Sequence, residues 1–156
     1  MSAQPKESPS PDDSNLPGDQ RIGHLLWETS SRANLMGEPL LANIQLSFPA
    51  MGALERIAAF PGITASGLAR QAFKTQQSVS QVTNRLERLG YIERRVGGGR
   101  GVGLYVTKAG EAALVDGAAC EQEIDSTLQG LLGPEDAERL RALLIRLRQR
   151  LIDTTE

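Results

Sequence analysis

Basic side chains that could bind a polyanion are concentrated in one stretch of the 156-residue sequence, residues 61–110. This stretch holds eight lysines and arginines but only two acidic residues, Glu87 and Glu93, so it carries a net charge of +6. The rest of the chain holds nine basic and 17 acidic residues and carries −8. A local basic block inside an acidic protein is typical of a surface that binds nucleic acid or another polyanion. A solvated basic face is the alternative that charge alone leaves open.

A helix predicted at the centre of this block carries groups that could recognise DNA bases. Thr75 is expected to cap it and Gly90 to end it, with an apolar stripe of Val79, Val82, Leu86 and Leu89. Amides and hydroxyls lie opposite the stripe, where amides could pair bidentately with adenine in a major groove. A polar face occurs on most surface helices, so this pattern is weak evidence alone. The candidate DNA-binding residues of this segment are Thr75, Gln76, Gln77, Ser80, Gln81, Asn84, Arg85 and Arg88.

A glycine-rich hairpin is predicted to follow the helix, with strands at 91–96 and 102–106. Arg94 and Arg95 flank its base, and Arg100 lies at its tip among five glycines. A slender loop with one guanidinium fits a minor groove about 6 Å wide, whose narrow regions attract arginine. These three arginines complete the candidate DNA-binding residues. A flexible turn without a ligand is the alternative for the glycine run.

The sequence lacks the residues that several other functions need. It has one cysteine, Cys120, and one histidine, His24, which excludes an intrachain disulfide and a Cys/His zinc site. Cys120 has no lysine or arginine within a helical turn, which favours a packing role over a redox role. Neither a phosphate-binding loop nor a nucleophile–base pair around His24 is present, so we expect no enzyme activity, cofactor or metal. Without an apolar run of about 18 residues or a signal peptide, we expect a cytoplasmic location.

The overall pattern predicts a mostly α-helical protein with a minor α+β component, a winged helix-turn-helix between flanking helices. Residues 1–19 are rich in proline and are expected to form a disordered leader. We expect N-terminal helices over 20–46, interrupted at Gly37 and Pro39, the winged unit over 47–107, and C-terminal helices over 108–156, broken at Gly133. Besides Thr75, the predicted N-caps are Ser47, Thr64 and Thr107.

The flanking helices have apolar faces that a compact winged unit cannot cover. The first helix is predicted to present Ile22, Leu25, Leu26, Thr29, Ala33 and Met36 on one face. The long helix after Thr107 has an apolar side that includes Ala112, Val115, Ala119 and Leu128. The last helix carries a stripe of Leu140, Leu143, Leu144, Leu147 and Leu151. Packing within one chain is the alternative to a shared interface between two copies.

Three segments together resemble the MarR family of winged-helix transcription regulators. "LSFPAMGALERIAAFPGITASGLARQ" is similar to the family's entry into the helix-turn-helix, and "SVSQVTNRLERLGYIERR" to its recognition helix and first wing strand. "RGVGLYVTKAGEAA" resembles the Arg-bearing second strand and the start of the following helix. The resemblance covers roughly residues 46–113. The family usually has an aspartate two residues before the wing arginine, where this chain has Gly98.

The resemblance implies a homodimer in which the N- and C-terminal helices of two subunits form the dimerisation region. Two winged units related by a two-fold axis would bind a pseudo-palindromic site with half-sites about one helical turn apart. Family members commonly bind small aromatic or anionic effectors, for which the candidate residues here are His24, Trp27 and Arg32. A packed tryptophan and a surface histidine are the alternative.

The function predicted from the sequence is a double-stranded DNA-binding transcriptional regulator, a ligand-responsive repressor that acts as a homodimer. A winged-helix module that binds an acidic protein partner is the alternative.

Overall fold

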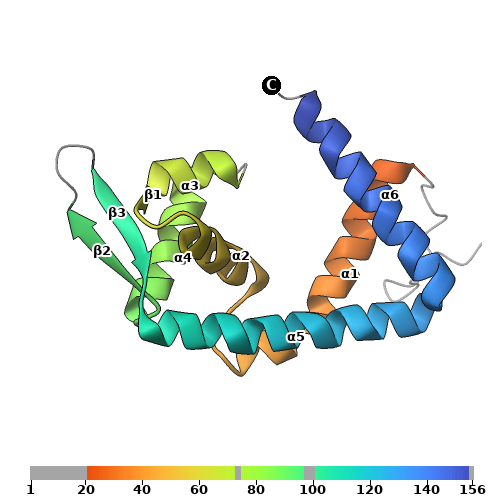
Figure 1. The fold of residues 1–156 in the computed structure, drawn as a ribbon, viewed down its shortest axis with the longest axis horizontal. Helices are drawn as coiled ribbons and strands as arrows, with labels where there is room; N and C mark the ends of the chain where they lie inside the picture. Colours follow the sequence, from red (N-terminus) through yellow and green to blue (C-terminus); the bar gives the residue numbers. More distant parts are fainter. Residues whose placement is uncertain (1–20, 73–74, 97–100, 155–156) are drawn as a thin grey trace, which may run out of the picture. The chain divides into compact units, whose positions relative to one another are not determined.

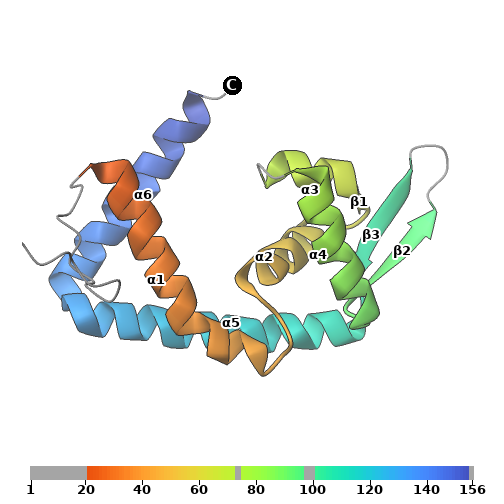
Figure 2. The same ribbon diagram turned by 180° about the vertical axis from the view of Figure 1, so that it is seen from behind.

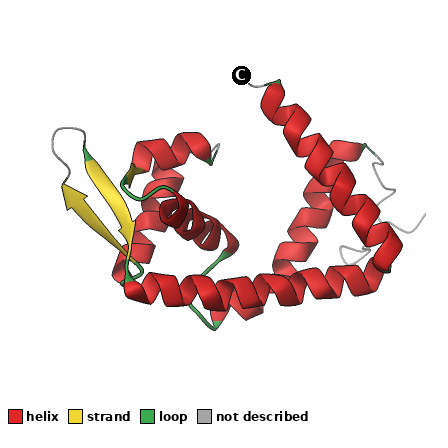
Figure 3. Cartoon of the chain, in the orientation of Figure 1, coloured by secondary structure: helices red, strands yellow, loops and turns green. Residues whose placement is uncertain are grey.

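The computed structural model describes residues 21–72, 75–96 and 101–154, and most of them are helical (Figure 3). The chain divides into two compact units, Met1–Arg32 and Ala33–Glu156. The mostly α-helical fold class with a small sheet is confirmed, and the predicted leader lies outside the described residues. The elements are α1 (Ile22–Ala42), α2 (Phe48–Ala59), β1 (Ile63–Thr64), α3 (Ala65–Gln71), α4 (Gln76–Arg88), β2 (Ile92–Val96), β3 (Val102–Val106), α5 (Lys108–Leu132) and α6 (Pro134–Asp153).

Within the second unit, α3 and α4 are the two helices of a helix-turn-helix, and β2 and β3 are its wing (Figure 1). The sheet is antiparallel, in the order β1-β3-β2. β2 and β3 pair from Ile92 opposite Val106 to Val96 opposite Val102. β1 was not predicted, because two residues give no alternation. β1 is a strand because it pairs with β3, where Ile63 lies opposite Leu104.

A single apolar core holds α4 against the rest of the winged unit. Leu54, Ile57, Leu68, Leu86 and Leu104 are at most 1% exposed and come from α2, α3, α4 and β3. Full burial of such a side chain is worth about 1.5–3 kcal/mol. Figure 2 shows α4 between α3 and the base of the wing. The core therefore fixes which face of α4 is turned outward.

Side-chain caps begin the helices of the winged unit at three of the predicted positions. Thr64 and Thr107 accept hydrogen bonds from Gly67 N and Gly110 N, each at 3.1 Å. The third cap, Thr75, begins α4. Ser47 occupies the N-cap position of α2 in extended conformation, but its side chain forms no cap bond. Local sequence is sufficient to specify these starts, because capping depends on residues three apart.

The predicted interruption at Gly37 and Pro39 is wrong, because α1 continues to Ala42. Pro39 lies near the C-terminal end of α1, where its missing N–H removes only one helical hydrogen bond. Gly37 is buried, and a β-carbon there would collide with the side chains of Phe48 and Ile124. Glycine therefore serves packing here rather than helix termination.

The apolar side expected for α5 is not the side that packs within this chain, since Ala112, Val115 and Ala119 are exposed and Leu128 is only half-buried. The buried positions of α5 are Gly110, Ala113, Gly117 and Ile124. Two of them are glycines, which allow close approach of neighbouring elements: a β-carbon on Gly110 would meet the Tyr91 carbonyl, and one on Gly117 would meet the Met51 side chain. Glycine has no side chain, so the hydrophobic periodicity of α5 does not mark Gly110 and Gly117 as positions that pack within the chain.

Two further predictions about helix ends hold. Gly90, with φ +73°, follows the C-cap of α4, and Gly133, with φ +78°, separates α5 from α6. Among the residues from 21 onward that the structure describes, no helix has the length and apolar character needed to cross a membrane.

Candidate nucleic-acid interface

Side-chain hydrogen bonds between Thr75 and Ser78 cap the N-terminus of α4. Thr75 Oγ1 accepts from Ser78 N at 3.2 Å, and Ser78 Oγ donates to the Thr75 carbonyl at 3.0 Å. Thr75, Gln76 and Gln77 are exposed. An exposed helix N-terminus favours a phosphate group, because its backbone N–H groups and helix dipole point toward the ligand.

The two faces of α4 differ as the sequence predicted. Val79 and Leu86 are buried, and Val82 and Leu89 are half-buried. Sequence reasoning missed Thr83, which is fully buried and belongs to the inward face. The outward face is exposed and consists of Gln77, Ser80, Gln81, Asn84 and Arg88. Amide, hydroxyl and guanidinium groups on one exposed helical face can form hydrogen bonds with base edges and phosphates.

Arg94 on β2 lies against α4 instead of projecting freely. Its Nη2 donates to Asn84 Oδ1 at 2.8 Å and to Thr83 Oγ1 at 3.3 Å. Its Nη1 forms an ion pair with Glu87 Oε2 at 3.1 Å. The wing and the predicted recognition helix are therefore joined by one guanidinium.

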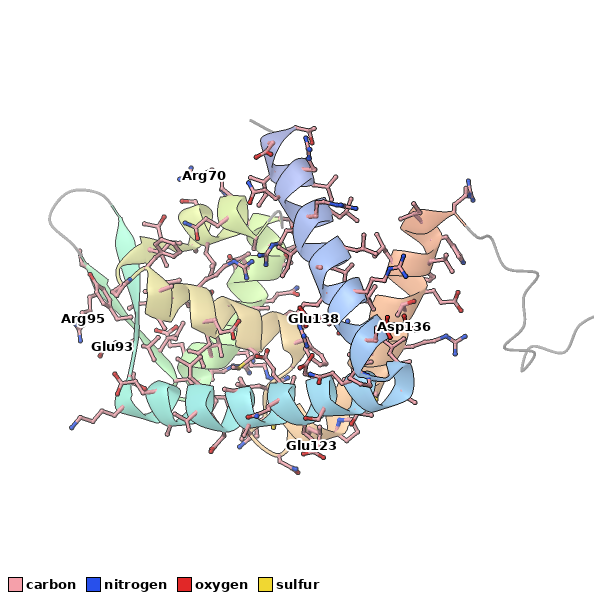
Figure 4. All side chains as sticks on the ribbon, turned by 45° about the vertical axis from the view of Figure 1, so that its right-hand side comes forward. Arg70, Glu93, Arg95, Glu123, Asp136 and Glu138 are labelled. Carbon is pink, nitrogen blue, oxygen red and sulfur yellow. The ribbon has the colours of Figure 1, made fainter. Side chains whose placement is uncertain are left out.

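Arg95 belongs to a different environment from Arg94, because neighbouring residues of a strand point to opposite faces of the sheet. Its guanidinium lies 4.6 Å from the centre of the Tyr105 ring and forms an ion pair with Glu93 (Figure 4). The structure therefore does not bring the two wing-base arginines together. Arg100, the predicted wing-tip contact, lies outside the described residues.

Arg85 also has an intramolecular partner, since its Nη2 donates to the backbone carbonyl of Gln45 at 2.9 Å. Arg88 is exposed in the last turn of α4. A further basic side chain, Arg70, is exposed in the last turn of α3 (Figure 4). Sequence reasoning counted Arg70 in the basic block but did not name it as a contact.

The three candidate effector residues lie in the first unit, on the N-terminal part of α1. The rings of His24 and Trp27 are 5.9 Å apart at 46°. Glu28 interacts with both other candidates: its carboxylate is 3.8 Å from His24 Nε2 and 2.9 Å from Arg32 Nη2. Trp27 is 66% exposed, so this chain alone does not bury its ring.

A groove of about 420 Å³ lies within the second unit, between α2, α3 and α4. Its walls include Phe48, Leu68 and Val82, together with the polar side chains of Arg56 and Gln81. None of the candidate effector residues lines it. Sequence patterns gave no signal for this groove, because its walls come from three separate helices.

The helix order, the capped helix-turn-helix and the two-stranded hairpin define a winged helix-turn-helix protein. Residues 44–101 match the model of the MarR family. The solved structure of MarR superposes with a TM-score of 0.79 at 21% identity, covering 85% of this chain and 98% of that one. The chain is therefore similar to the MarR family over residues 44–101 and shares the fold of its solved member.

Two relatives match most of the chain. The HTH-type transcriptional repressor Rv2887 of Mycobacterium tuberculosis is 28% identical over 131 residues, covering 82% of this chain and 94% of the relative. Solved structures of Rv2887 include complexes with DNA and with salicylic acid. A probable transcriptional regulator from Pseudomonas aeruginosa is 26% identical with a TM-score of 0.73, covering 83% of this chain and 98% of that one.

Proposed function

We propose that this chain is a MarR-type DNA-binding regulator, a sequence-specific repressor that binds a pseudo-palindromic operator as a homodimer. The observation that carries the proposal is the exposed polar face of α4, with Gln77, Ser80, Gln81, Asn84 and Arg88 beside a capped helix N-terminus. These groups match the hydrogen-bonding edges of bases in a major groove. The mycobacterial relative Rv2887 is a transcriptional repressor, which supports repression as the sign of regulation.

A homodimer accounts for the apolar side chains that a single chain leaves in water. On α6, Leu140, Leu143, Leu144 and Leu151 are 41–58% exposed. On the first turns of α1, Ile22 is 72% exposed. An apolar stripe of this kind marks an interaction surface, and closed two-fold dimers are the commonest oligomers. Two copies of α4 related by such an axis would contact half-sites about one helical turn apart.

The proposed effector is a small aromatic or anionic molecule that binds near His24, Trp27 and Arg32 and lowers DNA affinity. The complex of Rv2887 with salicylic acid supports this ligand class. Trp27 is the single tryptophan, so its fluorescence reports directly on the proposed site. We expect titration with salicylate to change that fluorescence and to release DNA over the same concentration range. An unchanged Trp27 signal during salicylate-induced release would place the effector elsewhere.

Selection from a pool of random 30-base-pair duplexes tests the proposed function. We expect enrichment of an inverted repeat whose half-sites are about 10 base pairs apart. Affinity should fall steeply as salt rises, because bound phosphates lose their counterions on binding. Binding without enrichment of any sequence would contradict sequence-specific recognition.

The alternative function is a winged-helix module that binds an acidic protein. It predicts no mobility shift with any short duplex, even at low salt. We also propose a cytoplasmic location, because a repressor must reach the DNA that it binds.

A further inference from the structure

Asn84 lies on the exposed face of α4, but part of its amide is already engaged. Arg94 Nη2 lies 2.8 Å from Asn84 Oδ1. Arginine carries only hydrogen-bond donors, so the amide atom that faces it must be the oxygen. The amide is therefore fixed in one of its two orientations, with its oxygen toward β2 and its NH₂ group left for another partner.

Arg94 is held by three side chains of α4 and cannot move to DNA without losing them. Glu87 supplies a carboxylate at 3.1 Å, and Thr83 supplies a hydroxyl oxygen at 3.3 Å. Thr83 is itself fully buried, and its hydroxyl donates to the Ser80 carbonyl at 3.2 Å. The guanidinium is thus anchored to a fixed point in the core and is neutralised by Glu87.

We propose that Arg94 is a positioning residue that makes Asn84 present hydrogen-bond donors to DNA, so that Asn84 selects a base edge that carries only acceptors. This inference rests on the proposed function. Pairing with adenine requires an amide to use its oxygen and its NH₂ group together on one base. Asn84 Oδ1 has two lone pairs, but the charged Arg94 occupies one of them and fixes the oxygen toward β2, which disfavours the paired use of both amide groups on one adenine. The free NH₂ group suits guanine, which presents N7 and O6, or thymine, which presents O4. The arrangement reverses the simple expectation that asparagine on a recognition helix selects adenine.

A thermal double-mutant cycle tests the contact without DNA. The variants are Asn84→Ala, Arg94→Met and the double variant, in the full chain. If the contact orders both side chains, the double variant should lower the melting temperature by less than the sum of the decreases in the two single variants. Strictly additive losses would overturn the contact and with it the inference.

Duplex selection with matched variants tests the specificity. Asn84→Ala should remove the preference at one base pair of each half-site, and the wild type should carry guanine or thymine there. Arg94→Met should admit adenine at that pair, raising its enrichment relative to guanine at least tenfold. Glu87→Gln is the control, since it removes the ion pair and leaves the bond to Asn84, and it should keep the wild-type preference. Wild-type selection of adenine or cytosine at that pair would overturn the inference, as would an Arg94→Met preference identical to that of the wild type.

If Arg94→Met does not fold, Asn84→Asp provides a second test of the base preference. Its carboxylate retains the bond to Arg94 but offers no donor, so the guanine or thymine preference should disappear and cytosine, which presents a donor, should replace it. A retained guanine or thymine preference would overturn the inference. If the wild type enriches no sequence at all, the proposed function fails and the specificity inference fails with it, and the thermal cycle still reports separately on the Arg94–Asn84 contact.

Discussion

Arg85 on α4 donates to the backbone carbonyl of Gln45 at 2.9 Å, although the two residues are 40 positions apart in the sequence. Gln45 has φ +55° in the loop between α1 and α2. The Tyr91 hydroxyl donates to the neighbouring Ile44 carbonyl at 3.1 Å. Two side chains that frame the end of α4 thus hold this loop, and a residue predicted from sequence as a DNA contact has a structural role.

We predict that Arg85→Ala lowers the stability of the fold, whereas Arg88→Ala weakens DNA binding. Arg85→Ala should lower the free energy of unfolding by about 1 kcal/mol, because it leaves the Gln45 carbonyl without its charged donor. Arg88→Ala should leave stability within about 0.5 kcal/mol of the wild type, as is usual for an exposed side chain. It should weaken DNA binding and reduce the dependence of affinity on salt. Urea denaturation and fluorescence anisotropy measure the two effects, and equal stability losses would contradict the assignment.

Thr107 connects the end of α4 to the start of α5. Its Oγ1 accepts from Gly110 N at 3.1 Å and donates to the Gly90 carbonyl at 2.6 Å. We expect Thr107→Val to cost about 1–2 kcal/mol of unfolding free energy, since an N-cap bond and a second hydrogen bond are lost together. Thr107→Ser retains the hydroxyl and should recover most of the loss. A serine variant as unstable as the valine variant would assign the effect to the methyl group instead.

Gly110 and Gly130, both on α5, should respond to alanine in opposite directions. A β-carbon at Gly110 would run into the Tyr91 backbone carbonyl, which cannot rotate away, so Gly110→Ala should cost at least about 2 kcal/mol. Around Gly130 nothing lies within 4 Å of an added β-carbon, and Gly130→Ala should stabilise α5 by up to about 1 kcal/mol. Thermal unfolding of both variants decides the point. Similar melting temperatures for the two would refute the close contact between α5 and the start of the wing.

Glu121 on α5 should make stability depend on pH. Burial, and secondarily the charge of Glu55, raise the pKa of its carboxyl above 4.5. A folded-state pKa above the unfolded value means that the charged carboxylate destabilises the fold at neutral pH. This cost fades as pH falls through the raised pKa and is absent below the unfolded value.

Glu121→Gln should therefore raise the melting temperature at pH 7, because the neutral amide removes the unfavourable burial of a charge. The gain should vanish by about pH 4, near the ordinary glutamate pKa. Glu123→Gln, at an exposed position two residues on, is the matched control and should show a smaller change. A gain that grows as pH falls would contradict the sign of the shift.

Features that depend on nearby residues could be predicted from the sequence. The caps at Thr64, Thr75 and Thr107 and the turn at Gly90 follow from residue types a few positions apart. The apolar stripe of α4 follows from helical periodicity, and it is what turns the candidate contacts outward.

Features that depend on packing between distant segments could not be predicted. The two-residue β1 forms only because β3 offers it hydrogen bonds. The hydroxyl of the buried Thr83 accepts a hydrogen bond from Arg94, which comes from another element. The sequence predicted that Arg94 and Arg95 both contact DNA from the base of the wing. In the structure they point to opposite faces of the strand, where Arg94 contacts Asn84 and Arg95 contacts Tyr105.

Binding of a selected duplex to a variant with Gln77→Ala, Ser80→Ala and Gln81→Ala shows whether the outward face of α4 recognises DNA bases. Each good base contact contributes about 1–3 kcal/mol, so we expect fluorescence anisotropy to show at least about a 100-fold loss of affinity for the selected site. Affinity for random duplex should change little, and Glu123→Gln should bind like the wild type. Undiminished affinity for the selected site in the triple variant would contradict recognition of DNA by the outward face of α4.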